Sequence, residues 1–369
     1  MTQAGAAGPS TPHTAALDAC AGCPSLCAQC SPEKRLQAAE PGGPGAATPQ
    51  NPCPTSERLA RFRQQGRVQA GSVIVSVFGD SVLPRGGRIW LGSLSGLLAP
   101  LGINDRLVRT SVFRLVQDDW LEAVAVGRRS DYRLSPAGRR RFAEAARQIY
   151  APALPPWDQR WRLVTLTGPL ESDVRDRLRR ALFWHGFGEL GSSCFVHPSA
   201  DLNAVFDALD AEGLGDSLLH LLPLVAANPH LPVSGSDAGL VRTAWNLGDL
   251  GADYAEFVAS YKPVLRQWQR GDGPPAAMGD DCAFLIRTLL IHDYRRLLLR
   301  DPQLPGVLLP ADWAGHEARA LCRQLYQQLL APSERHLNRS LTLADGEVPT
   351  ASALLTERFG LSDPLRIWA

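Results

Sequence analysis

Residues 89–135 contain a strand, two helices and a hairpin, and this order restricts the fold more than any other feature of the chain. A short strand is expected at Ile89–Leu91 and a helix near Ser93–Leu101. A second helix is expected over residues 104–118, followed by two strands around a turn at Gly127–Asp131. Two helices joined by a tight turn and followed by a hairpin are typical of a winged helix–turn–helix, whose second helix normally enters the major groove of DNA.

The second helix divides into an apolar side and a basic side. The residues expected at helical spacing to face the core are Ile103, Leu107, Ser111 or Val112, and Leu115. The residues expected on the opposite side are Arg106, Arg109, Thr110 and Phe113, with Arg114 at the margin. Arg128 and Arg129 at the hairpin turn are expected near the minor groove or the backbone phosphates. Arginine suits DNA contact because its guanidinium binds guanine or phosphate through two hydrogen bonds; a solvated surface helix is the alternative.

Charge is distributed unevenly along the chain. The formal net charge of all 369 residues is only +1. The segment from Arg58 to Arg147 nevertheless contains 16 arginines and no lysine against seven acidic residues, which gives it a formal charge of about +9 and the remainder about −8. A basic segment attached to an acidic body indicates a nucleic-acid-binding module with a separate regulatory part.

The rest of the chain is expected to form further domains. A proline-rich linker at residues 151–159 precedes a β-α-β-β-α-β pattern, which is typical of a ferredoxin-like domain. We therefore predict an α+β protein with these parts: a disordered cysteine-containing extension (1–56), a winged helix–turn–helix (57–150), a ferredoxin-like middle domain (157–232), a helical C-terminal domain (237–335) and a C-terminal tail (336–369). No apolar run is long enough to span a membrane and the N-terminus does not have the pattern of a secretory signal, so a cytoplasmic location is expected.

The proline-, glycine- and alanine-rich extension contains a cysteine cluster. Cys20, Cys23, Cys27 and Cys30 follow the pattern C-x2-C-x3-C-x2-C. Paired cysteines of this kind often hold zinc or an iron–sulfur cluster, but the two pairs are closer together than in a zinc ribbon. An adventitious thiol cluster and a metal or redox site both stay open, and no cofactor is expected to be required.

Several unusual strings lie within about residues 57–332. They include VFGDSVLPRGGRIWLGSL, RLVRTSVFRLVQDDWL, GRRSDYRLSPAGRRRF and LLIHDYRRLLLRDPQLPGVLLPADWAGHEARALCRQLY. These strings resemble the PaaX family of repressors of phenylacetic acid degradation. The resemblance implies a middle domain similar to the small nuclease of CRISPR spacer acquisition and a C-terminal domain for effector binding and dimerisation. It further implies a homodimer that binds double-stranded operator DNA and is released by phenylacetyl-coenzyme A.

An acyl-CoA effector requires cations for its phosphates and an apolar slot for its acyl group. The candidate contacts in the C-terminal domain are Arg242, Trp245, Arg287, His292, Tyr294, Arg295 and Arg296. Tyr254 and Tyr261 lie seven residues apart, on one helix face, and could line the same pocket. Aromatic residues at helical spacing are more often part of the core, and the interface between the middle and C-terminal domains is an equally plausible location for the site.

Other functions are compatible with parts of the sequence. A nuclease of the spacer-acquisition type needs an aspartate at the end of the first strand of the middle domain, yet no acidic residue occurs there before Glu171, so no enzyme activity is expected. The protein could instead regulate another aromatic-acid operon in response to a different acyl-CoA. A regulator that responds to metal or redox state through the cysteine cluster is a further alternative.

Overall fold

The computed structural model describes residues 53–64, 69–154, 156–227, 236–270 and 279–360. The predicted disordered extension therefore lies outside the described residues, apart from its last four positions. The same holds for the cysteine cluster of Cys20, Cys23, Cys27 and Cys30.

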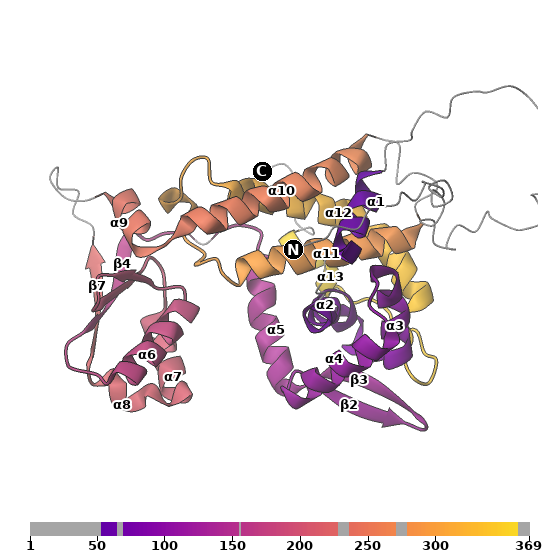
Figure 1. The fold of residues 1–369 in the computed structure, drawn as a ribbon, viewed down its shortest axis with the longest axis horizontal. Helices are drawn as coiled ribbons and strands as arrows, with labels where there is room; N and C mark the ends of the chain where they lie inside the picture. The colour runs from indigo at the N-terminus through magenta and orange to yellow at the C-terminus, as the bar shows by residue number, and fades with distance from the viewer. Residues whose placement is uncertain (1–52, 65–68, 155, 228–235, 271–278, 361–369) are drawn as a thin grey trace, which may run out of the picture. The chain divides into compact units, whose positions relative to one another are not determined.

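The first part of the described chain combines helices with a small sheet (Figure 1). Its helices are α1 (Pro54–Gln64), α2 (Ala70–Val77), α3 (Leu91–Leu98), α4 (Asp105–Gln117) and α5 (Pro136–Ile149), and its strands are β1 (Arg88–Trp90), β2 (Leu121–Val126) and β3 (Arg129–Leu134). A π-helical turn at Phe78–Val82 and a 3-10 turn at Leu83–Arg85 continue α2. The strands form an antiparallel sheet in the order β1-β3-β2.

Local capping interactions determine where α4 and α5 begin. The Asn104 side chain accepts a hydrogen bond of 2.9 Å from the backbone N–H of Leu107, and the Ser135 hydroxyl accepts one of 2.9 Å from Gly138. Before α4, Gly102 has a φ of 81°, a left-handed conformation that glycine adopts without strain. The helix predicted over residues 104–118 and the hairpin after it are therefore confirmed as elements.

The middle part contains a four-stranded antiparallel sheet with helices on one face. Its elements are β4 (Arg160–Leu166), α6 (Ser172–Trp184), β5 (Gly188–Leu190), β6 (Cys194–His197), α7 (Leu202–Leu209), α8 (Gly215–Leu218) and β7 (Leu221–Ala227). The strand order is β5-β6-β4-β7. Val164 of β4 packs with Leu178 of α6 and Leu209 of α7 in one core. The predicted β-α-β-β-α-β order is confirmed.

Helices dominate the last part of the described chain. They are α9 (Asp237–Ala244), α10 (Leu247–Gln269), α11 (Asp280–Leu298), α12 (Ala314–Ser340) and the short α13 (Leu354–Glu357). After α12 the chain returns to the first sheet, where the carbonyl of Thr342 accepts a hydrogen bond of 3.1 Å from the Trp90 N–H. The backbone N–H of Ala344 donates to Asp131 of β3 at 2.7 Å.

The first part and the C-terminal helices share one hydrophobic core. Ile74 of α2 and Val112 of α4 belong to the same buried cluster as Ile286 of α11 and Leu325 of α12. The middle part has a core of its own around Val164. Helix α11 is buried on most sides because it lies between α12 and the helices of the first part, with which it is in contact.

A buried ionic network crosses this shared core at the π-helical turn after α2. The Asp80 carboxylate lies 2.7 Å from the Arg287 Nε of α11 and 2.8 Å from the Arg358 Nη1. The hydroxyls of Tyr150 and Tyr326 donate to it at 2.7 and 3.0 Å. Burial alone would raise the pKa of Asp80, but the two guanidinium groups and the two hydroxyls outweigh burial and lower it. Asp80 therefore joins α2 to α11 and to the C-terminal segment.

Candidate nucleic-acid interface

Helix α4 presents a basic face to solvent. The exposed residues include Arg106, Arg109, Thr110, Phe113 and Arg114, as expected from the sequence, whereas Val108, Ser111, Val112 and Leu115 are buried. The expectation that Leu107 faces inward is wrong, because its side chain is 37% exposed. Val108 occupies the buried stripe instead, since it lies four and seven residues before Val112 and Leu115, and Leu107 falls at the margin.

The arginine side chains of this face differ in whether they have a hydrogen-bond or ion-pair partner in the protein. The side chains of Arg106 and Arg114 have no hydrogen-bond or ion-pair partner among the described residues. Arg109 instead donates from Nε to the Asp105 carboxylate at 2.7 Å, and Asp105 also accepts from Ser95 at 2.8 Å. The hydrogen bonds from Arg109 and Ser95 lower the pKa of Asp105, so this carboxylate is ionised at neutral pH. Arg106 and Arg114 are therefore the cations most available to a ligand.

The hairpin contributes two arginines with different environments. Arg128 follows Gly127 at the tip between β2 and β3, is exposed, and has no side-chain partner in the described part of the chain. The guanidinium of Arg129 lies 4.7 Å from the ring centroid of Trp90 and donates to the Ala344 carbonyl at 3.3 Å. Arg128 is thus available to an anion, while Arg129, the first residue of β3 after the turn, is stacked on Trp90.

Two further exposed arginines were missed by the sequence analysis. Arg139 and Arg140 lie in the first turns of α5 and have no side-chain partner among the residues that the structure describes. Their neighbour Arg141 is held, because its guanidinium stacks 5.0 Å from the Trp120 ring centroid and donates to the Asp119 carbonyl at 3.2 Å. The run of three arginines after Gly138 was the available signal, but sequence alone does not show which of the three is held.

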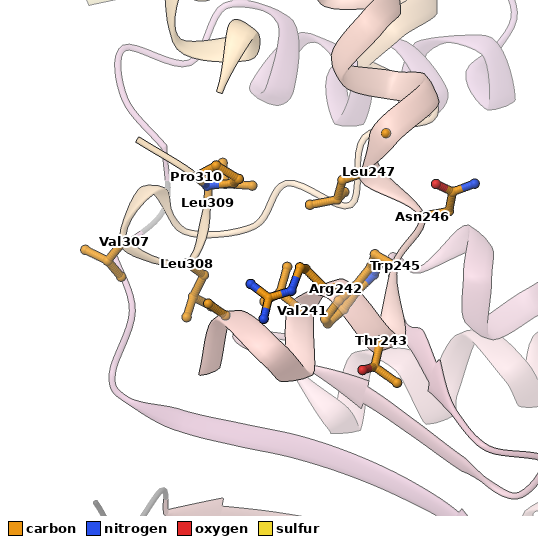
Figure 2. Close-up of a pocket in the computed structure, with 12 residues that line it drawn as sticks. Val241, Arg242, Thr243, Trp245, Asn246, Leu247, Val307, Leu308, Leu309 and Pro310 are labelled. Atoms are coloured by element: carbon orange, nitrogen blue, oxygen red, sulfur yellow. The ribbon is translucent and has the colours of Figure 1, made fainter. Parts of the chain in front are cut away.

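A pocket of about 590 Å³ lies beside the junction between the end of α9 and the start of α10. Figure 2 shows Val241, Arg242 and Trp245 on one side of it, with Leu309 and Pro310 across from them. Trp245 is fixed in place by two contacts. Its Nε1 donates to the Gly186 carbonyl at 3.0 Å, and its ring centroid lies 6.3 Å from that of Trp161. The pocket therefore combines apolar walls with one exposed arginine whose side chain has no described partner.

The other expected effector contacts do not line this pocket. Arg287 is fully buried between Asp80 and Glu334, and Tyr294 is buried against Phe257. His292 is buried beside Ser76, and burial lowers its pKa to about 4.

The remaining expected residues are also distributed over different environments. Arg295 donates to the Ser72 hydroxyl at 2.8 Å, and Arg296 is exposed. Tyr254 and Tyr261 are buried, and their hydroxyls donate to Asp301 and Asp293, each at 2.6 Å. Of the residues expected from the sequence, the structure therefore brings only Arg242 and Trp245 together at this pocket.

The described residues show neither a metal-binding cluster nor a membrane-spanning helix. They contain no group of three or more His, Cys, Asp or Glu side chains that could hold a metal ion. Within the same residues, no helix is both long and apolar enough to cross a membrane.

Comparison with known proteins identifies the family. The PaaX-like protein model matches residues 69–138, the PaaX protein central Cas2-like domain matches residues 154–222, and the PaaX-like protein C-terminal domain matches residues 245–339. The transcriptional repressor PaaX of Escherichia coli (strain K12) is 38% identical over 296 residues, which cover 79% of this chain and 90% of that protein. The molecule is thus a mixed helix-and-sheet protein built around a Cas2-like central domain. The chain belongs to the PaaX family, which confirms the resemblance.

One solved structure is also similar. The uncharacterized protein Rv0674 from Mycobacterium tuberculosis shares 24% identity, with 66% of this chain and 90% of that chain covered and a TM-score of 0.42. A TM-score this low adds nothing to the description of the fold.

Proposed function

We propose that the protein is a PaaX-type transcriptional repressor that binds operator DNA through a winged helix–turn–helix. In this proposal α3 and α4 are the two helices, α4 enters the major groove, and the β2–β3 hairpin is the wing. The observation that carries it is the set of exposed arginines without described partners, Arg106 and Arg114 on α4 and Arg128 on the hairpin. The E. coli relative, a transcriptional repressor, supports the same function.

The residues of this interface have distinct proposed roles. Arg106, Arg109, Thr110 and Arg114 contact bases or the phosphates that border the groove. Arg128 and Arg129 contact the backbone or the minor groove beside it. Arg139 and Arg140 on α5 are additional candidates for phosphate contacts, because both are exposed and without described partners.

We propose phenylacetyl-CoA as the effector and the pocket beside α9 as its site. The apolar side chains, among them Val241 and Leu308, would take the phenyl group, Trp245 would stack on it, and Arg242 would bind a phosphate or carbonyl oxygen. The exposed Arg296 is a further candidate for a phosphate contact. Arg287, His292, Tyr294 and Arg295 would act through the packing of α11, because their side chains contact other parts of the protein.

Release from DNA follows if the effector and the operator favour different arrangements of a homodimer. An operator with two half-sites requires one spacing between the two copies of α4. An acyl-CoA that binds a second arrangement more tightly lowers operator affinity by the coupling free energy between the two sites.

The test combines DNA binding with effector titration. Purified protein is titrated against duplexes that cover the promoters of phenylacetate degradation genes in the source genome, and phenylacetyl-CoA, benzoyl-CoA, acetyl-CoA and free CoA are then added separately. We expect tight, sequence-specific binding that phenylacetyl-CoA reverses and acetyl-CoA does not.

Each other outcome points to a different function. Release by another aromatic acyl-CoA alone assigns the protein to a different aromatic-acid operon. If none of the acyl-CoAs releases the DNA but a chelator or an oxidant added afterwards does, the sensing function moves to the cysteine cluster. Absence of specific binding to all of these promoters rejects the phenylacetate degradation genes as the target.

A further inference from the structure

The centre of the exposed face of α4 is apolar rather than charged. The Phe113 side chain is 65% exposed, although it is a large aromatic group on a helix that is otherwise polar on this side. No aromatic ring or cation stacks on it within the described residues. The hydroxyl of Thr110 donates to the Arg106 carbonyl of its own helix at 2.9 Å. Because the hydroxyl proton is already donated, the methyl group of Thr110 is left to make an apolar contact with a ligand.

Helical geometry places these two groups in one line along the helix. Thr110 and Phe113 are three residues apart and therefore neighbours on the surface. Arg106 lies seven residues before Phe113 and the exposed Gln117 lies four after it, so both fall on the same line. Arg109 and Arg114 lie at the two sides of this line. An apolar pair is thus flanked by groups that can form hydrogen bonds with base edges.

The chemistry of the major groove offers one apolar feature to such a pair. Only thymine presents a methyl group there, and side chains such as phenylalanine and the threonine methyl recognise it by contact. Phosphates are charged and gain nothing from an aromatic side chain at the middle of the helix. The position of Phe113 between hydrogen-bonding residues therefore suits a base edge better than the DNA backbone.

We propose that Phe113, together with the Thr110 methyl, packs against the 5-methyl group of a thymine and makes the protein specific for an A·T pair at that position of its operator. This inference rests on the proposed entry of α4 into the major groove. It adds a specificity-determining residue to that function, beside the arginines of the face, which the proposed function places against bases or phosphates.

The experiment begins with in vitro selection from a pool of random DNA duplexes, carried out with the full chain and with its Phe113→Ala variant. The wild-type protein should select a site that contains at least one invariant thymine which the variant no longer requires. Synthetic duplexes of the wild-type site are then made with uracil in place of each thymine in turn, which removes only the methyl group. We expect wild-type affinity to fall about fourfold at one or two positions, the change that accompanies loss of one buried methyl group.

The variants distinguish methyl recognition from a general loss of binding. Phe113→Ala should bind the thymine and uracil duplexes equally, and Thr110→Ser, which keeps the hydroxyl, should reduce the discrimination in part. Phe183→Ala removes another exposed phenylalanine, on α6, and should keep the wild-type discrimination. Thermal melting confirms that each variant is folded.

Two results would overturn the inference, and they differ from failure of the proposed function. If Phe113→Ala keeps the full preference for thymine over uracil, Phe113 does not read the methyl group. If Phe113→Ala changes the oligomeric state but not the selected sequence, the side chain belongs to a protein contact. If Arg106→Ala also leaves binding unchanged, or if selection returns no sequence, α4 does not enter the groove and the proposed function itself fails.

Discussion

At the scale of single residues, the exposed arginines of α4 and the hairpin differ in their availability to a ligand, because only some of them have hydrogen-bond or ion-pair partners in the protein. Arg106 and Arg128 both lack a described partner, but one lies on α4 and the other at the hairpin tip. A residue that reads bases should affect sequence preference, whereas one that contacts phosphates should affect all sequences alike. This difference separates their contributions experimentally.

Replacement of these two arginines is expected to give different signatures. Arg106→Ala should weaken binding to the operator by more than binding to unrelated DNA. Arg128→Ala should weaken both by similar factors and reduce the slope of log affinity against log salt by about 1. Fluorescence anisotropy at several salt concentrations measures both quantities. Identical effects of the two substitutions on both kinds of DNA would contradict the separate roles.

Asp105 is expected to restrain DNA binding. Its carboxylate accepts a hydrogen bond from Arg109 at 2.7 Å and adds a negative charge to the face that we propose to approach phosphates. Asp105→Asn removes that charge and releases Arg109, so affinity for DNA should rise several-fold and its salt dependence should become steeper. Glu144→Gln removes a charge from an exposed position on α5 and serves as the control. Weaker binding by a fully folded Asp105→Asn protein would show that the ion pair positions Arg109 for DNA contact.

At the scale of elements, the Asp80 network joins α2 to α11 and to the segment after α13. Asp80→Asn leaves Arg287 and Arg358 without their shared charge partner in a buried environment. Removal of one partner of a buried ion pair typically costs about 3–5 kcal/mol of unfolding free energy. Urea unfolding at pH 7 measures this loss, and Asp312→Asn, at an exposed position, is the matched control. A loss no greater than that of the control would show that the network does not stabilise the fold.

The same network predicts a dependence on pH. Because the folded-state pKa of Asp80 is lowered, its stabilising contribution is complete above the unfolded value of about 3.9 and is lost as pH falls through the folded-state value. The difference in unfolding free energy between wild type and Asp80→Asn should therefore be constant near neutral pH and shrink in acid. A difference that grows on acidification would contradict the lowered pKa.

The elements also show how far the sequence predicts the structure. The positions of α4, α5 and the hairpin could be predicted because caps, glycine and periodicity act over a few residues. Leu107 was misplaced because a residue at the margin of a helical stripe fits either side. The partners of Asp80 could not be predicted, since Arg287 and Arg358 lie 207 and 278 residues away in the sequence.

The candidate sites show the same difference between features set by neighbouring residues, which could be predicted, and features set by residues distant in sequence, which could not. The basic face of α4 was predicted because one helix carries it. Arg242 and Trp245 were predicted as effector contacts from their residue types, but the pocket also requires Val307–Pro310, some 60 residues further along the chain. Arg287 and Tyr294 look like ligand contacts in sequence, and only packing shows them to be buried.

At the scale of the whole molecule, the pocket beside α9 and the proposed DNA-binding face of α4 are expected to be coupled. Arg242→Ala should leave operator affinity unchanged and raise the phenylacetyl-CoA concentration needed for release by about tenfold or more, because a charge-assisted contact is lost. Arg266→Ala, which removes an exposed arginine of α10 outside the pocket, is the control. The measurement is release of labelled operator during effector titration. An unchanged midpoint for Arg242→Ala would place the effector elsewhere.

The hydrophobic core shared by α2–α5 and α10–α12 has a consequence for protein engineering. A fragment that ends after α5 would expose the surfaces that Ile74 and Val77 bury together with α11, and it should aggregate rather than act as a small DNA-binding tag. Chimeras that exchange operator specificity between relatives should therefore graft only the exposed face of α4 and the hairpin tip. Such grafts leave every buried side chain with the neighbours it has in its own protein.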